Sequence, residues 1–140
     1  MRKLTITVIL ALFLALTSQA KVQSITKPVQ DSEELRLQDM LMLFLQPHIM
    51  DAVGDYYYPQ ILNFKPYVNP WDIEVIQTKR VNDFRGFLFE ITLLVEPSDG
   101  GHNVKVGKDC ITFQISVRPS VKLVKYKHLA TYELPPDLIK

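Results

Sequence analysis

The sequence predicts an α+β domain in which two N-terminal helices pack on an antiparallel meander of three or four strands. Apolar side chains recur at helical spacing between residues 31 and 58. After residue 70, apolar and polar residues alternate in several runs, and short breaks rich in Gly, Pro, Asn and Asp separate these runs. Helices that precede a group of strands are typical of α+β folds. We therefore expect one sheet face to cover the helices and the other face to be wetter.

The first twenty residues have the order of a secretory signal. A basic start at Arg2 is followed by the uncharged run Leu4 to Leu16. A helix of that length spans roughly 20 Å, whereas the hydrocarbon core of a bilayer is about 30 Å thick. Small residues follow at Ser18 and Ala20, as a signal peptidase requires. We expect cleavage between Ala20 and Lys21; an uncleaved N-terminal anchor is the alternative.

Length and composition after that cleavage suit one exported domain. We expect a flexible lead-in over 21–30, a single α+β domain over 31–134 and a tail over 135–140, with no stable membrane span. Residues 101–140 carry seven basic and three acidic side chains. This excess could favour an anionic surface such as a wall polymer or lipid headgroup, and a solvated strand face explains it equally well. No nucleic-acid module is present, so we expect no such partner.

The single cysteine, Cys110, excludes an internal disulfide. Small secreted domains of eukaryotes usually carry several bridges, so this composition favours a bacterial product. Cys110 is either a small buried hydrophobe at a strand entrance or a free thiol that pairs between chains.

Two helices are predicted by capping and periodicity. Asp31 is the expected N-cap, with Glu34 three residues on as in a capping box. The first helix carries a wide apolar stripe and should be buried on most sides; the stripe comprises Leu37, Met40, Leu41 and Phe44. Pro47 should kink the chain or restart it as the first residue of a second helix, which Pro59 closes.

Alternation then predicts the strands. The expected strands are Trp71–Ile76, Phe84–Val95, Val104–Val117 and a short fourth strand, Val121–His128. Gly107 marks a possible bulge. The order of elements resembles the layout of cystatin-like and nuclear-transport-factor-like folds, a likeness of topology that implies no function.

Two stretches are candidates for binding. In the loop Asp99 to Asn103, two glycines permit positive φ, so His102 and Asn103 could present a titratable ring and an amide to a ligand. The alternative is a turn in which Asn103 satisfies backbone amides. Tyr56, Tyr57 and Tyr58 could line a pocket rim, or they could pack at the end of a helix.

The sequence lacks the motifs of catalysis and of cofactor binding. The three histidines, His48, His102 and His128, have neither the spacing nor the cysteine partners of a zinc site. No serine lies in a Gly-x-Ser-x-Gly context and no phosphate loop is present. We expect no metal, no cofactor and no catalytic residue.

Four segments together resemble a family of small exported proteins of unknown function from spore-forming Gram-positive bacteria. They are Leu45–Tyr57, Gly100–Asn103, Asp109–Ile115 and Val121–His128. The likeness covers residues 33–128. It departs from the family after Asn103, where Val104 and Lys105 replace the usual prolines. The resemblance implies export and one domain, and it supplies no activity.

These observations favour a non-enzymatic binding domain that acts at the cell envelope or outside the cell. Its partner would be an unidentified protein or envelope polymer, and the sequence leaves its oligomeric state open. One alternative is a small enzyme with a pocket between helix and sheet, using His102 or a tyrosine as acid or base. A protease inhibitor, by analogy with the cystatin-like layout, is the other.

Overall fold

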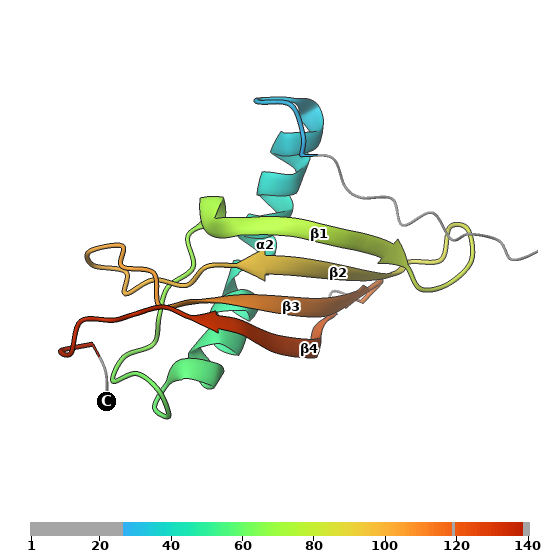
Figure 1. Cartoon of the computed structure of the whole chain (residues 1–140). Coiled ribbons are helices and arrows are strands. Elements are labelled where there is room, and N and C mark those ends of the chain that lie inside the picture. The colour runs from blue at the N-terminus through green and yellow to red at the C-terminus, as the bar shows by residue number, and fades with distance from the viewer. Residues whose placement is uncertain (1–26, 119, 139–140) are drawn as a thin grey trace, which may run out of the picture.

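One helix followed by an antiparallel sheet makes up the domain (Figure 1). The computed structural model describes residues 27–118 and 120–138. Helix α2 spans Glu33–Tyr57, a 3₁₀ turn η1 spans Pro70–Asp72, and strands β1 to β4 span Ile73–Arg80, Leu88–Val95, Gly107–Ser116 and Ser120–Thr131. The α+β class is confirmed, and the two N-terminal helices are wrong. The expected signal peptide, with its cleavage site between Ala20 and Lys21, lies outside the described residues.

A single helix forms because Pro47 lies inside α2 without ending it. Pro47 has no backbone N–H and so cannot donate to the carbonyl of Leu43, one turn earlier. Both residues are exposed, so water can replace the missing hydrogen bond. On the other side of the helix, Leu45 and Ile49 are buried in the same core. An interior proline costs about 3 kcal/mol or more. Packing against one sheet on both sides of Pro47 outweighs that cost.

The helix also begins one residue later than the capping-box spacing predicts. Ser32 is the N-cap, and its hydroxyl accepts a hydrogen bond from the Leu35 amide at 3.1 Å. Asp31 has a positive φ of 55° and lies before the helix, where its carboxylate faces Arg36 at 3.4 Å. Two adjacent residues could have capped this helix, and the backbone conformation at Asp31 leaves the role to Ser32.

The four strands form a sheet in the order β1-β2-β3-β4, with every neighbouring pair antiparallel. The meander was predicted, but of the strand ends only that of β2 at Val95 agrees with the prediction. Trp71 lies in η1 and is 76% exposed instead of lying on a strand, β2 begins at Leu88, and β4 reaches Thr131. The longer β4 continues the pairing along the whole of β3, from Ser116 to Gly107.

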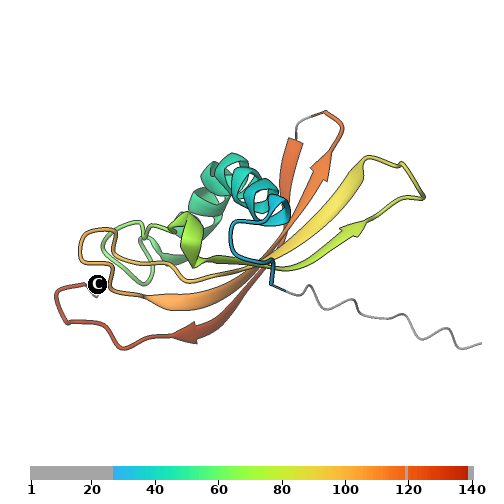
Figure 2. The same cartoon turned by 90° about the horizontal axis from the view of Figure 1, so that it is seen from above.

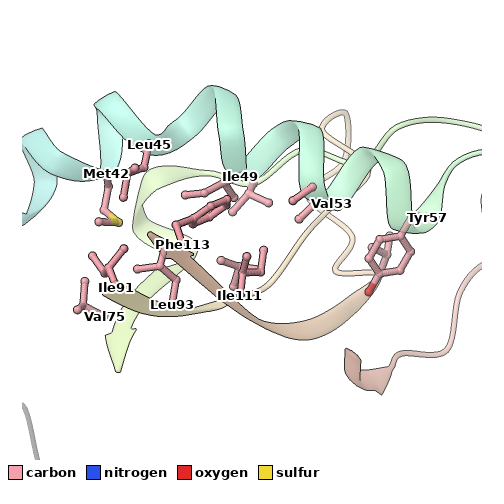
Figure 3. Packing of buried hydrophobic residues seen from close by; sticks show 14 of the residues in the cluster. Met42, Leu45, Ile49, Val53, Tyr57, Val75, Ile91, Leu93, Ile111 and Phe113 are labelled. Atoms are coloured by element: carbon pink, nitrogen blue, oxygen red, sulfur yellow. The ribbon is translucent and has the colours of Figure 1, made fainter. Parts of the chain in front are cut away.

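The core lies between α2 and one face of the sheet. Figure 2 shows the helix lying across this face, and Figure 3 shows the side chains that meet there. Met42, Leu45, Ile49 and Val53 of the helix and Val75, Ile91, Leu93, Ile111 and Phe113 of the strands are buried in this cluster. The strand residues follow the inward parity of the predicted alternation, which is why the sequence located this part of the core.

The opposite side of α2 is not buried, contrary to the prediction. The exposed fraction is 56% for Leu37, 50% for Met40 and 80% for Phe44. Figure 1 shows the N-terminal part of the helix extending past β1 at the sheet edge. The sheet can cover only one side of this segment, so the apolar stripe remains at the surface of the described residues.

Candidate functional site

A polar cluster lies beneath the C-terminal turn of α2, where three elements meet. Tyr57 ends the helix, Asp109 lies on β3, and His128 is its cross-strand neighbour on β4. Figure 3 shows Tyr57 at the end of the row of buried side chains. Asp109 shares the inward parity of Ile111 and Phe113, so the strand carries a carboxylate into the core.

Asp109 is fully buried and has two side-chain partners. The Tyr57 hydroxyl donates to Asp109 Oδ2 at 2.9 Å, and His128 Nδ1 lies 2.7 Å from Asp109 Oδ1. Burial, followed by the Asp109 charge, raises the pKa of Tyr57, so its hydroxyl stays protonated and remains a donor. A buried carboxylate is tolerated when such partners replace its water. The pair of bonds ties the end of the helix to both strands.

Aromatic rings enclose this cluster. The Tyr56 ring stacks on Tyr126, with centroids 4.8 Å apart, and on His128 at 5.2 Å. The Tyr126 hydroxyl is buried and has no hydrogen-bond partner among the described residues. Burial and the nearby Asp109 charge raise the pKa of Tyr126 as well. The stacked rings fix the plane of the imidazole.

Gly107 allows the cluster to close. A Cβ atom at this position would run into the Tyr57 hydroxyl and lie 2.7 Å from the Ala130 carbonyl oxygen. The sequence marked Gly107 as a possible bulge, whereas the structure shows that its role is close approach. A side chain here would separate Tyr57 from Asp109.

The cluster continues to a surface hydroxyl. His128 Nε2 lies 2.8 Å from Thr131 Oγ1, and Thr131 is exposed. A carboxylate that orients an imidazole, with a hydroxyl on the other ring nitrogen, is the arrangement that activates nucleophiles in hydrolases. The same bonds also brace a sheet edge. Sequence reasoning considered His128 only as a zinc ligand and missed Asp109 and Thr131; the inward parity of Asp109 was the available signal.

The predicted binding loop is an exposed turn. The Asp99 carboxylate accepts the amides of His102 at 3.1 Å and Val104 at 3.0 Å, while the His102 side chain is 89% exposed. Asn103 adopts a positive φ of 58°. Desolvation opposes the effect, but these hydrogen bonds hold the pKa of Asp99 below its ordinary value. The geometry supports the turn interpretation, with Asp99 rather than Asn103 as the residue that satisfies the amides.

The three consecutive tyrosines have different surroundings. Tyr57 is 1% exposed and bonds Asp109, Tyr56 is partly buried in the ring stack, and Tyr58 is 40% exposed just beyond the helix. They do not form one pocket rim. Two of them pack at the helix end, and only Tyr58 faces the solvent to a large extent.

A second surface lies at the far end of the sheet, where the β1–β2 loop (residues 81–87) and the β3–β4 turn both occur. We call it the hairpin end, comprising Arg80, Val81, Phe84, Arg85, Phe87, Val117 and Arg118. Figures 1 and 2 show both hairpins reaching this end of the sheet. Phe84 is 91% exposed, Val117 72% and Phe87 54%. Large apolar side chains next to three arginines on protruding loops need a reason beyond folding.

A third feature is a groove of about 550 Å³ between the N-terminal half of α2 and β1. Its apolar lining comes from Val29, Leu37 and Leu41 and from the strand residues Val75 and Ile91. It is continuous with the exposed stripe of α2 through Leu37. Lys27 and Pro28 also contribute to its lining.

The remaining features that bear on chemistry are metal ligands, the free thiol and membrane-spanning helices. Among residues 27–118 and 120–138, no three His, Cys, Asp or Glu side chains are placed to hold a metal ion. Cys110 is a partly buried free thiol opposite Lys127 on β4. Within the same residues, no helix has the length and apolar character needed to cross a bilayer.

Comparison with known proteins gives a family and nothing more specific. The model of a family described as "Protein of unknown function (DUF3888)" matches residues 37–130. No curated protein and no solved structure matches the chain. The expected membership of a family of unknown function is therefore confirmed, while its bacterial source and its export stay predictions.

Proposed function

The chain belongs to the DUF3888 family of proteins of unknown function, and we propose that it is an exported, non-enzymatic binding domain that acts at the cell envelope through its hairpin end. The basic and apolar start of the chain supports export. The resemblance to small exported proteins of spore-forming Gram-positive bacteria supports a bacterial envelope as the site of action.

The exposed hairpin end is the observation that carries this proposal. The fold does not use Phe84, which is 91% exposed, and it does not use Val117, which is 72% exposed. Isolated apolar residues are common on protein surfaces, but a group on two adjacent hairpins typically marks an interaction site. The neighbouring arginines give that site an affinity for anionic surfaces, which are abundant in a bacterial envelope.

The polar cluster supports binding rather than catalysis. Asp109 is fully buried, and its oxygens are occupied by Tyr57 and His128. His102, the other candidate acid or base, projects from a turn and lies 3.4 Å from Asp99. The buried groups serve the fold and the exposed histidine is not enclosed, so binding at the surface explains the molecule with fewer assumptions.

Fractionation of expressing cells tests this proposal. The protein should leave the cytosol, its intact mass should show loss of residues 1–20, and it should be retained by crude envelopes that contain both wall and membrane. A Phe84→Ser/Phe87→Ser variant should be exported equally well but retained poorly. Accumulation of the full-length form in the cytosol would reject the proposal.

A small hydrolase is the second candidate, favoured by the contact between His128 Nε2 and Thr131 Oγ1. In this alternative Asp109 orients His128, which takes the Thr131 proton as the hydroxyl attacks an ester or amide carbonyl. His128 then gives this proton to the alcohol or amine that leaves as its bond to the carbonyl carbon breaks, and water hydrolyses the acyl group from Thr131. The residues differ from the His102 or tyrosine expected from the sequence. Hydrolysis of activated esters by the wild type but not by Thr131→Ala would favour it; equal rates would remove it.

A further inference from the structure

We propose that the hairpin end binds the surface of an anionic phospholipid bilayer, with Phe84 and Phe87 entering the interface and Arg85 and Arg118 meeting lipid phosphates. This inference names the partner of the surface described above, and it rests on the proposed function in requiring that the chain reach an envelope membrane.

The apolar side chains have the placement that interfacial insertion needs. Phe84 lies within the β1–β2 loop and is 91% exposed, and Val117 follows the end of β3 and is 72% exposed. Both belong to hairpin connections at one end of the sheet (Figure 2). Side chains on protruding turns can pass between headgroups while the polar outer face of the sheet stays in water.

The β1–β2 loop is held open by its own contacts. The Val81 amide donates to the Leu88 carbonyl at 2.8 Å, and the Gly86 amide donates to the Asp83 carbonyl at 2.8 Å. A Cβ atom at Gly86 would lie 2.6 Å from the Asn82 side chain, so this compact loop requires glycine there. The loop therefore presents Phe84 without further ordering on binding.

Arg80 adds a second brace. Its guanidinium carbon lies 4.4 Å from the centre of the Phe89 ring, and its Nη1 donates to the Gly86 carbonyl. Phe87 lies farther away, at 6.0 Å, and keeps 54% of its surface exposed. Arg80 thus supports the loop, while Phe84 and Phe87 remain available to a ligand.

The charges at this end complement an anionic surface. Arg80, Arg85 and Arg118 carry three positive charges, and Asp83 in the same loop carries one negative charge, for a sum of 3 − 1 = +2. Arg85 and Arg118 are exposed and form no ion pair with any described residue. Guanidinium groups bind phosphate oxygens through two parallel hydrogen bonds, and anionic leaflets attract nearby basic side chains.

A bilayer fits the combination of features better than other envelope components. An anionic wall polymer could bind the arginines, but it offers no apolar phase for Phe84 and Phe87. A lipid surface satisfies both groups at once: phosphates lie at the depth of the arginines, and acyl chains lie just beneath.

Vesicle sedimentation tests the inference. The exported protein would be mixed with vesicles of phosphatidylcholine alone and of phosphatidylcholine with phosphatidylglycerol. We expect binding to the anionic vesicles only, and Phe84→Ser/Phe87→Ser should lower the partition coefficient by roughly 100-fold, since each buried phenylalanine contributes about tenfold. Arg85→Gln/Arg118→Gln should weaken binding by roughly tenfold or more, and salt should weaken wild-type binding.

Phe44→Ser is the matched control. Phe44 is 80% exposed on α2 and does not belong to the hairpin end, so its loss should leave binding unchanged. Every variant carries the same N-terminal residues, and differences among variants therefore report only the substituted surface. A Phe84→Trp/Trp71→Phe variant adds a depth readout, because its fluorescence should shift to the blue with anionic vesicles.

Several results would overturn the inference. One is equal binding by the wild type and Phe84→Ser/Phe87→Ser; another is equal loss with Phe44→Ser. A third is a Phe84→Trp emission that anionic vesicles leave unchanged. Retention by crude envelopes without vesicle binding would refute the lipid partner and leave the proposed function standing. A protein that stays in the cytosol but binds anionic vesicles would refute the proposed function and leave the affinity for lipid standing.

Discussion

The bond between the Tyr57 hydroxyl and Asp109 should be one of the strongest single polar contributions to the stability of this domain. Tyr57→Phe removes only an oxygen, so the ring and its packing stay. The lost bond is 2.9 Å long, is fully buried and has an ionised acceptor. Hydrogen bonds to charged groups contribute about 1.5–3 kcal/mol, and here Asp109 also loses one of its two partners. We expect the free energy of unfolding to fall by about 2 kcal/mol.

Urea denaturation followed by circular dichroism measures this loss, which corresponds to a midpoint lower by roughly 1–2 M for a domain of this size. Tyr58→Phe is the matched control, because Tyr58 lies next in the sequence, is 40% exposed, and its hydroxyl forms no hydrogen bond with a described residue. It should change stability by less than about 0.5 kcal/mol. If the two variants unfold at the same urea concentration, Asp109 is not the brace that the geometry indicates.

Three further predictions concern the helix, the glycine and the turn. Pro47→Ala should raise the urea midpoint, because it restores an interior helix bond; a drop would show that Pro47 starts a separate helix. Gly107→Ala should lower the free energy of unfolding by more than about 2 kcal/mol, because its Cβ atom would displace Tyr57. The double variant Gly107→Ala/Tyr57→Phe should then lose less stability than the sum of the two single changes. Asp99→Asn should be less stable than the wild type near neutral pH. Because the pKa of Asp99 is lower in the folded state than the ordinary value of 3.8, the carboxylate's stabilisation is lost as the pH falls through the folded-state pKa, and the difference between the two proteins should disappear. A difference that persists at pH 2 would contradict this.

Local pattern was enough to predict the parts of the fold that repeat at short range. Ile91, Leu93 and Val95 alternate inward along β2, and Ile111 and Phe113 do so along β3, so the sheet face and its antiparallel order followed from period two. Pro47 was misread because a proline is a local signal, whereas the continuity of α2 depends on Leu45 and Ile49 reaching one distant sheet.

The candidate site was harder to predict because its residues are far apart in the sequence. Asp109 lies 52 positions from Tyr57 in the sequence, and His128 lies 71 positions from Tyr57. His102 and Asn103 looked functional because glycines surround them, yet that composition is also what a tight turn needs. The exposed hairpin end was missed for another reason: Phe84 and Phe87 lie on the margin of an apolar run and were assigned to the strand that begins at Leu88.

The two regions of this molecule differ in what holds their side chains in place. Tyr57 and Asp109 depend on each other through their hydrogen bond, and both depend on the missing side chain at Gly107. Substitutions at these three positions would therefore lower the stability of the domain. At Phe84, the loop conformation depends on backbone bonds and on Gly86, and the ring contributes almost nothing to the fold because 91% of it is exposed. A serine at position 84 would fold equally well and be more soluble. A phenylalanine held outward on a braced loop, beside arginines, is therefore best explained by a binding surface that lies outside the domain itself.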